Sequence, residues 1–397
     1  MPLRLTLFLV ALLLTVPFSF DVQAQNRAPR GTLASRNSSL RLYLSRSAPI
    51  SRNVRMARIP RFAAQRSVTY NAPQVQAAPL ARPIALGAYF YQNGQCAPGD
   101  GGAVSAYKAR AGKMPAVWMI FQSWTGWNQF PIAQAKRARQ LGGQLMVTWE
   151  PWNQQKNDPN WNCAMIAGGY KDTYIRRYAR AVKKSGVPVM IRFAHEMNGD
   201  WYPWGTAFSS NFRRSNGNSP QHFVAMWRRV VDIFRQEGAS NARWVWAPNI
   251  HFLNNYNSIG DQNRDLSELY PGDHYVDWIG LSVYNDASRR NWRTFSDLFG
   301  GAYQTVTAIT HKPLMIAEMG VTEQGAPSGT SKAQWISQTL LNDIPARFPR
   351  VRLVNWFCRD KSNMGEANYR FDSSPSSLRA FRLAANSPLY GARLTGN

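Results

Sequence analysis

Cysteine is scarce in this sequence. The 397 residues include only Cys96, Cys163 and Cys358. They form no CxxC pair and have no histidine pair nearby, which excludes the common zinc-binding patterns. In an oxidising compartment they allow at most one internal disulfide, and one thiol must be left over. The sequence therefore indicates no metal site, and we expect no cofactor.

Acidic residues are also few. The chain has 22 Asp and Glu against 47 Lys and Arg, and its formal net charge is +25. Residues 25–83 contain eleven arginines but no lysine and no acid. Such a segment cannot build an apolar core, and we interpret it as a disordered linker. The alternative is that its arginines bind an acidic polymer or an envelope surface. Because no aromatic residues alternate with the charges in a nucleic-acid-binding motif, we expect no specific nucleic-acid partner.

The apolar run near the amino terminus is short. It extends from Leu5 to Phe18, contains a proline, and falls below the roughly 20 residues that cross a bilayer. Arg4 precedes it, and the small-residue sequence Val22-Gln23-Ala24 follows it. This pattern predicts a signal peptide over residues 1–24 and a secreted or periplasmic protein. An uncleaved membrane anchor is the alternative, which the length of the run disfavours.

Strand-like segments recur from residue 84 onward. They are short, rich in β-branched and aromatic residues, and almost continuously apolar, as strands covered by helices on both faces are. The eight candidates are residues 84–91, 116–124, 144–149, 188–194, 242–247, 276–284, 312–317 and 351–357.

Amphipathic segments that predict helices lie between these strands, for example over residues 169–185, 221–236 and 332–343. Ser219-Pro220 has the sequence of a helix start, and Gly238 follows the end of the same helix. Eight alternations of strand and helix over about 310 residues predict an α/β fold, a (β/α)8 TIM barrel that forms a single domain over residues 84–397.

Two of the predicted strands lead directly into a glutamate. The fourth reads PVMIRFAHEMNGDWYPWG over residues 188–205 and carries Glu196, and the seventh reads KPLMIAEMG over residues 312–320 and carries Glu318. Catalytic groups of a barrel lie at the carboxyl ends of its strands. Strands four and seven lie across the barrel from each other, so we expect the two carboxylates to converge.

A pair of converging carboxylates is what glycoside cleavage requires. One must be protonated to donate to the leaving oxygen, and the other must be ionised to attack the anomeric carbon. We predict that Glu196 is the general acid/base and Glu318 the nucleophile of a retaining mechanism. A single glutamate at a strand end is more often a solvated surface group. Two glutamates behind apolar runs on opposing strands make that interpretation much weaker.

Neighbouring residues offer means to separate the two pKa values. Arg192 lies four residues before Glu196 on the same strand face, so we expect it inside the barrel and paired with Glu318. The rings of Trp201, Tyr202 and Trp204 are placed to desolvate Glu196 and raise its pKa. His195-Glu196 also begins a zinc-protease motif, but position 199 is a glycine where that motif needs a second histidine.

Further polar and aromatic residues follow other strands. Tyr284 ends the sixth, and Trp356 lies near the end of the eighth, where a hydroxyl beside the nucleophile and a plate beneath a sugar are reasonable roles. Packing within the barrel is the alternative for both. Glu150 and Trp152 follow strand three and Asn249 follows strand five, and we interpret them as walls of a binding groove. Glu150 either binds a sugar hydroxyl or neutralises the arginine inside the barrel.

The motif RFAHEMNGDWYPWG resembles the signature of family 26 glycoside hydrolases, best known as β-mannanases. VWAPN (245–249), GLSVYND (280–286) and IAEMG (316–320) follow in the order of that family. The resemblance covers residues 87–371 and gives Glu196 and Glu318 the same two catalytic roles. It further implies that His195 and Tyr284 contact the reacting sugar and that Trp201 and Trp356 line its subsites.

The resemblance implies an endo-acting hydrolase whose partner is a polysaccharide, with β-1,4-mannan as the leading substrate. Strand three ends in WEPW, whereas many mannanases of the family carry a histidine in that region. Mixed-linkage β-glucan, β-1,3-xylan and an exopolysaccharide therefore stay open as substrates, as does transfer instead of hydrolysis. A barrel that binds polysaccharide without cleaving it and a basic structural protein that binds surfaces are the rival classes. We expect a monomer.

Overall fold

The computed structural model describes residues 83–394, apart from residues 156–157, 207–216, 251–264 and 289. The predicted signal peptide, and the predicted linker except for Pro83, lie outside the described residues. The strands are β1 (Ile84–Gln92), β2 (Gln95–Cys96), β3 (Val117–Ser123), β4 (Gln144–Glu150), β5 (Val189–Phe193), β6 (Ala242–Trp246), β7 (Trp278–Asn285), β8 (Leu314–Val321), β9 (Val351–Cys358) and β10 (Tyr390–Gly391).

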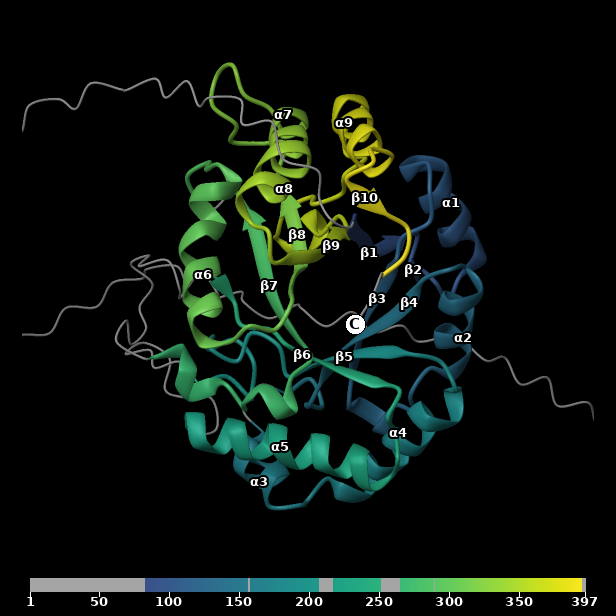
Figure 1. The fold of residues 1–397 in the computed structure, drawn as a ribbon, viewed down its shortest axis with the longest axis vertical. Helices are drawn as coiled ribbons and strands as arrows, with labels where there is room; N and C mark the ends of the chain where they lie inside the picture. Colours follow the sequence, from purple (N-terminus) through teal and green to yellow (C-terminus); the bar gives the residue numbers. More distant parts are fainter. Residues whose placement is uncertain (1–82, 156–157, 207–216, 251–264, 289, 395–397) are drawn as a thin grey trace, which may run out of the picture. The chain divides into compact units, whose positions relative to one another are not determined.

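Eight of these strands form a closed parallel barrel (Figure 1). Pairing runs in sequence order from β1 through β3 to β9, and β9 pairs with β1 to close the ring. The short β2 pairs antiparallel with the end of β1, and β10 adds two residues parallel to its beginning. The predicted (β/α)8 barrel is confirmed.

The barrel strands lie close to their predicted positions. Seven of them begin and end within two residues of the prediction, because an uninterrupted apolar run marks a strand that is buried on both faces. The exception is β8, which continues to Val321, four residues past the predicted end at 317. Glu318 therefore lies within a strand instead of after it.

Helices surround the barrel (Figure 1): α1 (Gly101–Ala111), α2 (Ile132–Gln140), α3 (Cys163–Ala167), α4 (Asp172–Ser185), α5 (Pro220–Gln236), α6 (Phe295–Ile309), α7 (Lys332–Gln338), α8 (Ile344–Arg347) and α9 (Pro375–Ala385). A π-helical turn, Thr339–Asp343, joins α7 to α8. Between β6 and β7 the structure describes residues 247–250 and 265–277, and the second of these segments holds two 3-10 turns, Leu266–Leu269 and Asp273–Tyr275. None of the helices in the described part of the chain has the length and apolar character needed to cross a bilayer.

The ends of α5 show why the sequence marks helix boundaries well. The Ser219 side chain accepts a hydrogen bond from the backbone N–H of His222, and Pro220 occupies the first turn, where a missing N–H costs nothing. Gly238 follows the last turn with φ +72°, a conformation that favours glycine. The predicted start and end of this helix are both confirmed.

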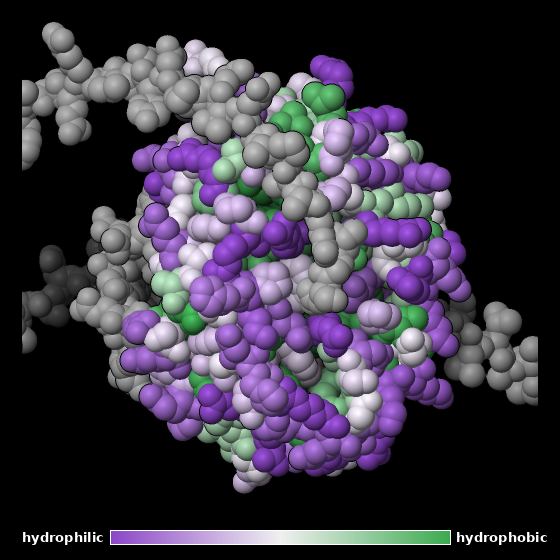
Figure 2. Space-filling model, viewed as in Figure 1, coloured by the Kyte–Doolittle hydropathy of each residue, from purple (hydrophilic) through white to green (hydrophobic). Residues whose placement is uncertain are grey.

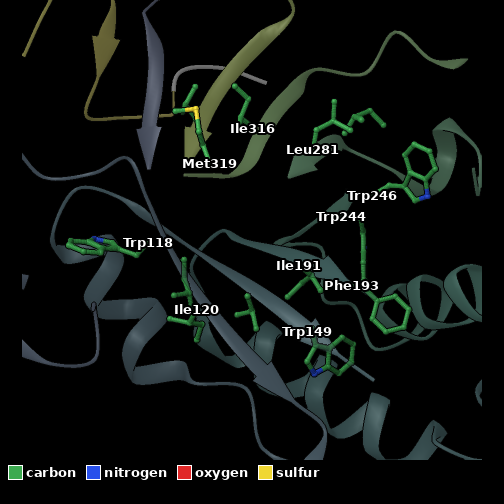
Figure 3. Close-up of a cluster of buried hydrophobic side chains, with 14 of the residues drawn as sticks. Trp118, Ile120, Trp149, Ile191, Phe193, Trp244, Trp246, Leu281, Ile316 and Met319 are labelled. Atoms are coloured by element: carbon green, nitrogen blue, oxygen red, sulfur yellow. The ribbon is translucent and has the colours of Figure 1, made fainter. Parts of the chain in front are cut away.

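The core has two layers that follow the alternation of side chains along each strand. Outward-facing residues pack under the helices, and Figure 3 shows part of this layer, with Trp149 and Phe193 close to each other. Inward-facing residues fill the barrel itself and include four methionines, Met119, Met146, Met190 and Met315. Along β5 the inward positions are Met190 and then Arg192, which is fully buried. Arg192 therefore lies inside the barrel, as predicted.

All three cysteines are free thiols. Cys163 and Cys358 are buried, and Cys96 is half-buried. The single disulfide that the sequence would have allowed does not form.

Candidate active site

The polar side chains of His195, Glu196 and Glu318 converge at one end of the barrel. Glu196 lies in the turn that follows β5, and Glu318 lies in β8. One polar atom from each of the three residues lies within 4.8 Å of the other two. A carboxylate pair about 5–5.5 Å apart is the spacing of retaining glycosidases, whereas inverting enzymes need a wider gap for a water molecule.

Arg192 joins the two sides of the barrel at this point. Its guanidinium forms an ion pair with Glu318 across the interior and is fully buried. It also donates hydrogen bonds to the Ser282 hydroxyl at 2.9 Å and to the Thr148 hydroxyl at 3.4 Å. The pairing expected from the sequence is present. The open alternative, neutralisation of Arg192 by Glu150, is not the arrangement found, because no ion pair joins these two described residues.

The second oxygen of Glu318 accepts a hydrogen bond from the Tyr284 hydroxyl at 2.6 Å. Burial and the nearby Glu318 charge raise the pKa of Tyr284 well above its usual range, so the phenol keeps its proton and stays a donor. Since both carboxylate oxygens of Glu318 act as acceptors, this side chain is placed as an anion, as a nucleophile must be.

Glu196 has a different environment. Burial and the neighbouring Glu318 carboxylate raise its pKa, while Arg192 and hydrogen bonds from Ser282 and Asn249 oppose the shift. The indole N–H of Trp201 donates to Glu196 at 2.9 Å. A carboxyl with a raised pKa next to a carboxylate held by a guanidinium is the division of roles that acid/base and nucleophile require.

The backbone at Glu196 is strained. Ala194 has φ +43° and Glu196 has φ +56°, in the left-handed region where residues with a Cβ are rare. The Glu196 N–H donates to the carbonyl oxygen of Ala247, just after β6, at 2.6 Å. Such strain costs on the order of 1–3 kcal/mol and persists where the surrounding structure fixes the residue. Here it directs the Glu196 carboxyl into the mouth of the barrel.

His195 is buried beside the two glutamates. Burial and the Arg192 charge lower its pKa well below the usual range, so the imidazole is neutral. Its ring lies 4.8 Å from the Tyr202 ring and 6.0 Å from the Phe121 ring. Its Nδ1 is buried and has no hydrogen-bond partner among the described residues.

Glu150 and Trp152 form the wall on the β4 side. Burial raises the pKa of Glu150 to about 7, and the Trp152 indole N–H donates to it at 3.3 Å. The Trp152 ring packs edge-on against the stacked pair Tyr202 and Trp204, at 5.7 and 5.9 Å. Trp152 is almost fully buried, so most of its ring packs against Tyr202 and Trp204 and little of it faces the groove.

The chain was compared with known proteins. A family model described as Glycosyl hydrolase family 26 matches residues 162–352, a range that includes both glutamates and Arg192. Endoglucanase H of Acetivibrio thermocellus is 33% identical over 286 residues, which are 71% of this chain and 29% of that protein. The chain belongs to glycosyl hydrolase family 26. The family predicted from the sequence motifs is confirmed.

Other relatives of this family 26 chain carry a different name. A Mannan endo-1,4-beta-mannosidase of Bacillus subtilis is 27% identical over 173 residues, which are 43% of this chain and 39% of that protein. The chain thus spans less than half the length of both relatives. Among solved structures, the catalytic domain of a GH26 endo-beta-1,4-mannanase from Bacillus sp. JAMB-750 matches with a TM-score of 0.56 at 18% identity, covering 79% of this chain and 88% of that chain. This match supports the barrel fold.

One residue that we predicted to line a subsite of the family 26 site, Trp356, lies elsewhere. Trp356 faces outward from β9, is fully buried, and packs against Phe381 of α9 with the rings 5.4 Å apart. Its indole N–H donates to the carbonyl oxygen of Tyr369. The expectation that Trp356 lies beneath a sugar is therefore wrong, because the strand alternation directs its neighbour Phe357 inward instead.

Four aromatic residues that the sequence did not single out complete the mouth of the family 26 barrel. Phe357 contacts Tyr89, Phe121, Tyr284 and Tyr369 with ring centroids 4.9–6.2 Å apart. Three of the four are Tyr89 in β1, Phe121 in β3 and Phe357 in β9. The alternation of inward and outward side chains along these strands was available from the sequence and would have selected them. Tyr369 comes from the loop after β9, and only the folded chain shows that it reaches Tyr284.

His195, Glu196 and Glu318 also offer one ligand atom each to a metal ion. The charge balance is unfavourable for a cation, because Glu318 already holds the Arg192 guanidinium. These residues fit a sugar-cleaving role in a family 26 barrel better than a metal centre.

Proposed function

We propose that this protein is a retaining, endo-acting glycoside hydrolase that cleaves internal β-glycosidic bonds of a polysaccharide, with β-1,4-mannan as its substrate. The observation that supports this most strongly is the pair formed by Glu196 and Glu318. Their polar atoms lie within 4.8 Å, one carboxyl has a raised pKa, and the other is bound by Arg192 and Tyr284.

The two glutamates act in two steps. In the first, an electron pair of Glu318 forms a bond to the anomeric carbon, the glycosidic C–O bond breaks, and the leaving oxygen takes the proton of Glu196. In the second, Glu196 removes a proton from water while the water oxygen displaces Glu318 from the same carbon. Two inversions at one carbon give net retention of configuration.

The surrounding residues position the sugar and the nucleophile. Arg192 and Tyr284 fix the Glu318 carboxylate, and we assign His195, Asn249 and Trp201 to contacts with the reacting sugar. Glu150 and Trp152 form the wall of the groove. The strained turn at Glu196 holds the proton donor at a fixed position before substrate arrives.

Mixed-linkage β-glucan is a second candidate substrate, because one relative, matched over 286 residues, is named an endoglucanase. The mannan assignment follows the names of several shorter matches, among them the Bacillus subtilis protein. β-1,3-Xylan and an exopolysaccharide are the remaining alternatives. A barrel that binds polysaccharide without cleaving it is disfavoured by the opposed environments of Glu196 and Glu318.

A substrate panel with matched variants tests the proposal. Purified β-1,4-mannan, mixed-linkage β-glucan, β-1,3-xylan and an acidic exopolysaccharide are incubated with the parent protein, Glu318→Ala and the exposed-site control Glu268→Gln. We expect internal cleavage of one neutral β-glycan and a loss of about 10⁴-fold or more in kcat for Glu318→Ala only. Equal cleavage by Glu318→Ala and the parent would reject the nucleophile assignment.

Azide separates the roles of the two glutamates. With an activated aryl β-glycoside, Glu318→Ala plus azide should give the α-glycosyl azide, because azide attacks the anomeric carbon of the bound glycoside from the side vacated by Glu318 and displaces the phenolate with one inversion. Glu196→Ala plus azide should give the β-glycosyl azide, because azide attacks the intermediate on Glu318. The same anomer from both variants would contradict the assignment.

We also propose that residues 1–24 are a cleaved signal peptide and that the mature protein is a secreted or periplasmic monomer. Support comes from the charged, apolar and small-residue parts of this segment. Amino-terminal sequencing of the exported protein should begin at Gln25. We propose that residues 25–83 serve as a solvated spacer. A protein that lacks them should then be retained on acidic polymer as strongly as the full chain is. Loss of retention would favour binding through the arginines.

A further inference from the structure

The positive charge of the folded domain is concentrated on four helices. Helices α1, α2, α4 and α9 carry twelve basic side chains and a single acid, Asp172. The basic residues, here named the basic wall, are Lys108, Arg110, Lys136, Arg137, Arg139, Arg176, Arg177, Arg180, Lys183, Lys184, Arg379 and Arg382. By contrast, the 15 residues of α6 contain no lysine or arginine.

These four helices follow one another around the outside of the barrel. In Figure 1 they run from α9 at the top through α1 and α2 on the right to α4 below, while α6 lies on the left. Helix α1 contacts α9, and α2 contacts α4. Hydrophilic side chains project from this side in Figure 2. The basic wall thus covers one continuous side of the domain instead of being distributed around it.

Three of the twelve basic side chains are neutralised within the protein: Arg110 pairs with Asp372, and Arg176 and Arg180 pair with Glu237. Lys136, Arg137, Arg139, Lys183 and Lys184 are exposed and form no ion pair with any described residue. The single acid of the wall, Asp172, is bound by Arg229 of α5. Like charges gathered on one face repel each other and lower stability, so their concentration points to a partner of opposite charge.

Two exposed apolar side chains lie in or directly before the helices of the basic wall. Among the described residues, the large hydrophobic side chains that are most exposed are Tyr170, 71% exposed, and Leu383, 64% exposed. Tyr170 comes just before α4, and Leu383 lies in α9. A tyrosine ring gives a flat apolar surface with a polar tip, which suits the face of a sugar ring.

We propose that the basic wall is a second carbohydrate-binding surface, which holds an acidic polysaccharide such as a polyuronate. A polyuronate carries one carboxylate per sugar for the lysines and arginines and offers sugar faces to Tyr170. An anionic lipid surface fits less well, because peripheral membrane proteins insert several apolar side chains and this wall exposes two. The inference does not depend on the proposed hydrolysis, since the wall lies on the outside of the barrel.

Charge-reversal variants of the full chain test the proposal. The wall variant is Arg137→Glu/Arg139→Glu/Lys184→Glu. The control variant is Arg243→Glu/Arg352→Glu/Arg393→Glu, three exposed arginines outside the wall with the same change in net charge. Binding to immobilised polygalacturonate is measured against salt concentration, together with thermal unfolding and hydrolysis of soluble substrate. At low salt the wall variant should bind polygalacturonate at least about tenfold more weakly than the parent protein. Its thermal unfolding and its hydrolysis of soluble substrate should be unchanged.

Further probes identify the ligand. Tyr170→Ala should weaken binding to polygalacturonate but not to polyphosphate, a polyanion without sugar rings. Equal losses for wall and control variants, or no loss for either, would overturn the proposal, because binding would then follow total charge or the residues before 84. The proposal would also be overturned if the wall variant lost binding to vesicles of phosphatidylcholine and phosphatidylserine but kept its binding to polygalacturonate.

Discussion

At the scale of single residues, the protonation of Glu196 depends on donors that favour its charged form. The Trp201 indole N–H is one of them, at 2.9 Å. Trp201→Phe keeps an aromatic ring but removes this donor, so the pKa of Glu196 should rise further. Because Glu196 must be protonated for the first step, activity is lost as pH rises through that pKa. The alkaline limb of kcat/KM should therefore move upward by about 0.5–1 pH unit. An unchanged or lowered limb would contradict this account.

The Arg192–Glu318 pair determines stability as well as chemistry. Arg192→Met leaves the Glu318 carboxylate buried without its partner, which should lower the free energy of unfolding by about 3–5 kcal/mol. The double variant Arg192→Met/Glu318→Gln removes both charges and should recover a large part of that loss. Urea unfolding at neutral pH measures both values. A double variant as unstable as the single one would show that packing, and not the unpaired charge, causes the effect.

At the scale of secondary structure elements, the two faces of β9 have different roles, one in packing and the other in substrate binding. Trp356 faces α9 and Phe357 faces the mouth. Trp356→Phe should lower the free energy of unfolding by about 1–3 kcal/mol and leave KM unchanged. Phe357→Leu should raise KM about fivefold with little loss of stability. Steady-state kinetics and urea unfolding on both variants check the split, and the reverse pattern would restore Trp356 as a subsite residue.

The same strand shows what the sequence can and cannot predict. Apolar runs located the strands, and their carboxyl ends led to Glu196 and Glu318, because burial on both faces leaves a clear pattern. The inward position of Arg192 followed from alternation with Met190. The outward position of Trp356 follows from the same alternation, because Leu353 and Phe357 are inward residues of β9. The subsite role of Trp356 came from its place near the strand end and from the family resemblance, neither of which takes this alternation into account.

At the scale of the whole molecule, contacts between distant segments decide what the mouth contains. Tyr369 lies 85 residues after Tyr284, yet their rings are 4.8 Å apart, and its hydroxyl donates to Asp286 at 3.0 Å. Nothing near Tyr369 in the sequence marks it as part of the site. The positive φ at Glu196 likewise results from the turn that follows β5 and from the hydrogen bond between the Glu196 N–H and the carbonyl oxygen of Ala247. Such features exist only once the barrel closes.

The buried acids of the mouth should make the stability of the molecule depend on pH. Burial raises the pKa of Glu150 from its usual 4.5 to about 7, so between these values the folded chain holds a proton that the unfolded chain releases. Stability from this group is therefore present below about pH 4.5 and is lost as pH rises to about 7. His195, whose pKa is lowered, acts in the opposite direction below about pH 6.5, so the wild-type profile alone does not isolate Glu150.

Glu150→Gln removes this dependence and leaves that of His195. The free energy of unfolding of the variant relative to wild type should increase with pH from 4.5 to 7, by up to about 3 kcal/mol, and stay level above pH 7. Urea unfolding of both proteins at half-unit steps between pH 4.5 and 8 measures this difference. Asp265→Asn, at an exposed site, is the control and should show no such increase. A constant difference for Glu150→Gln would mean that Glu150 titrates alike in the folded and unfolded chains, in spite of its burial.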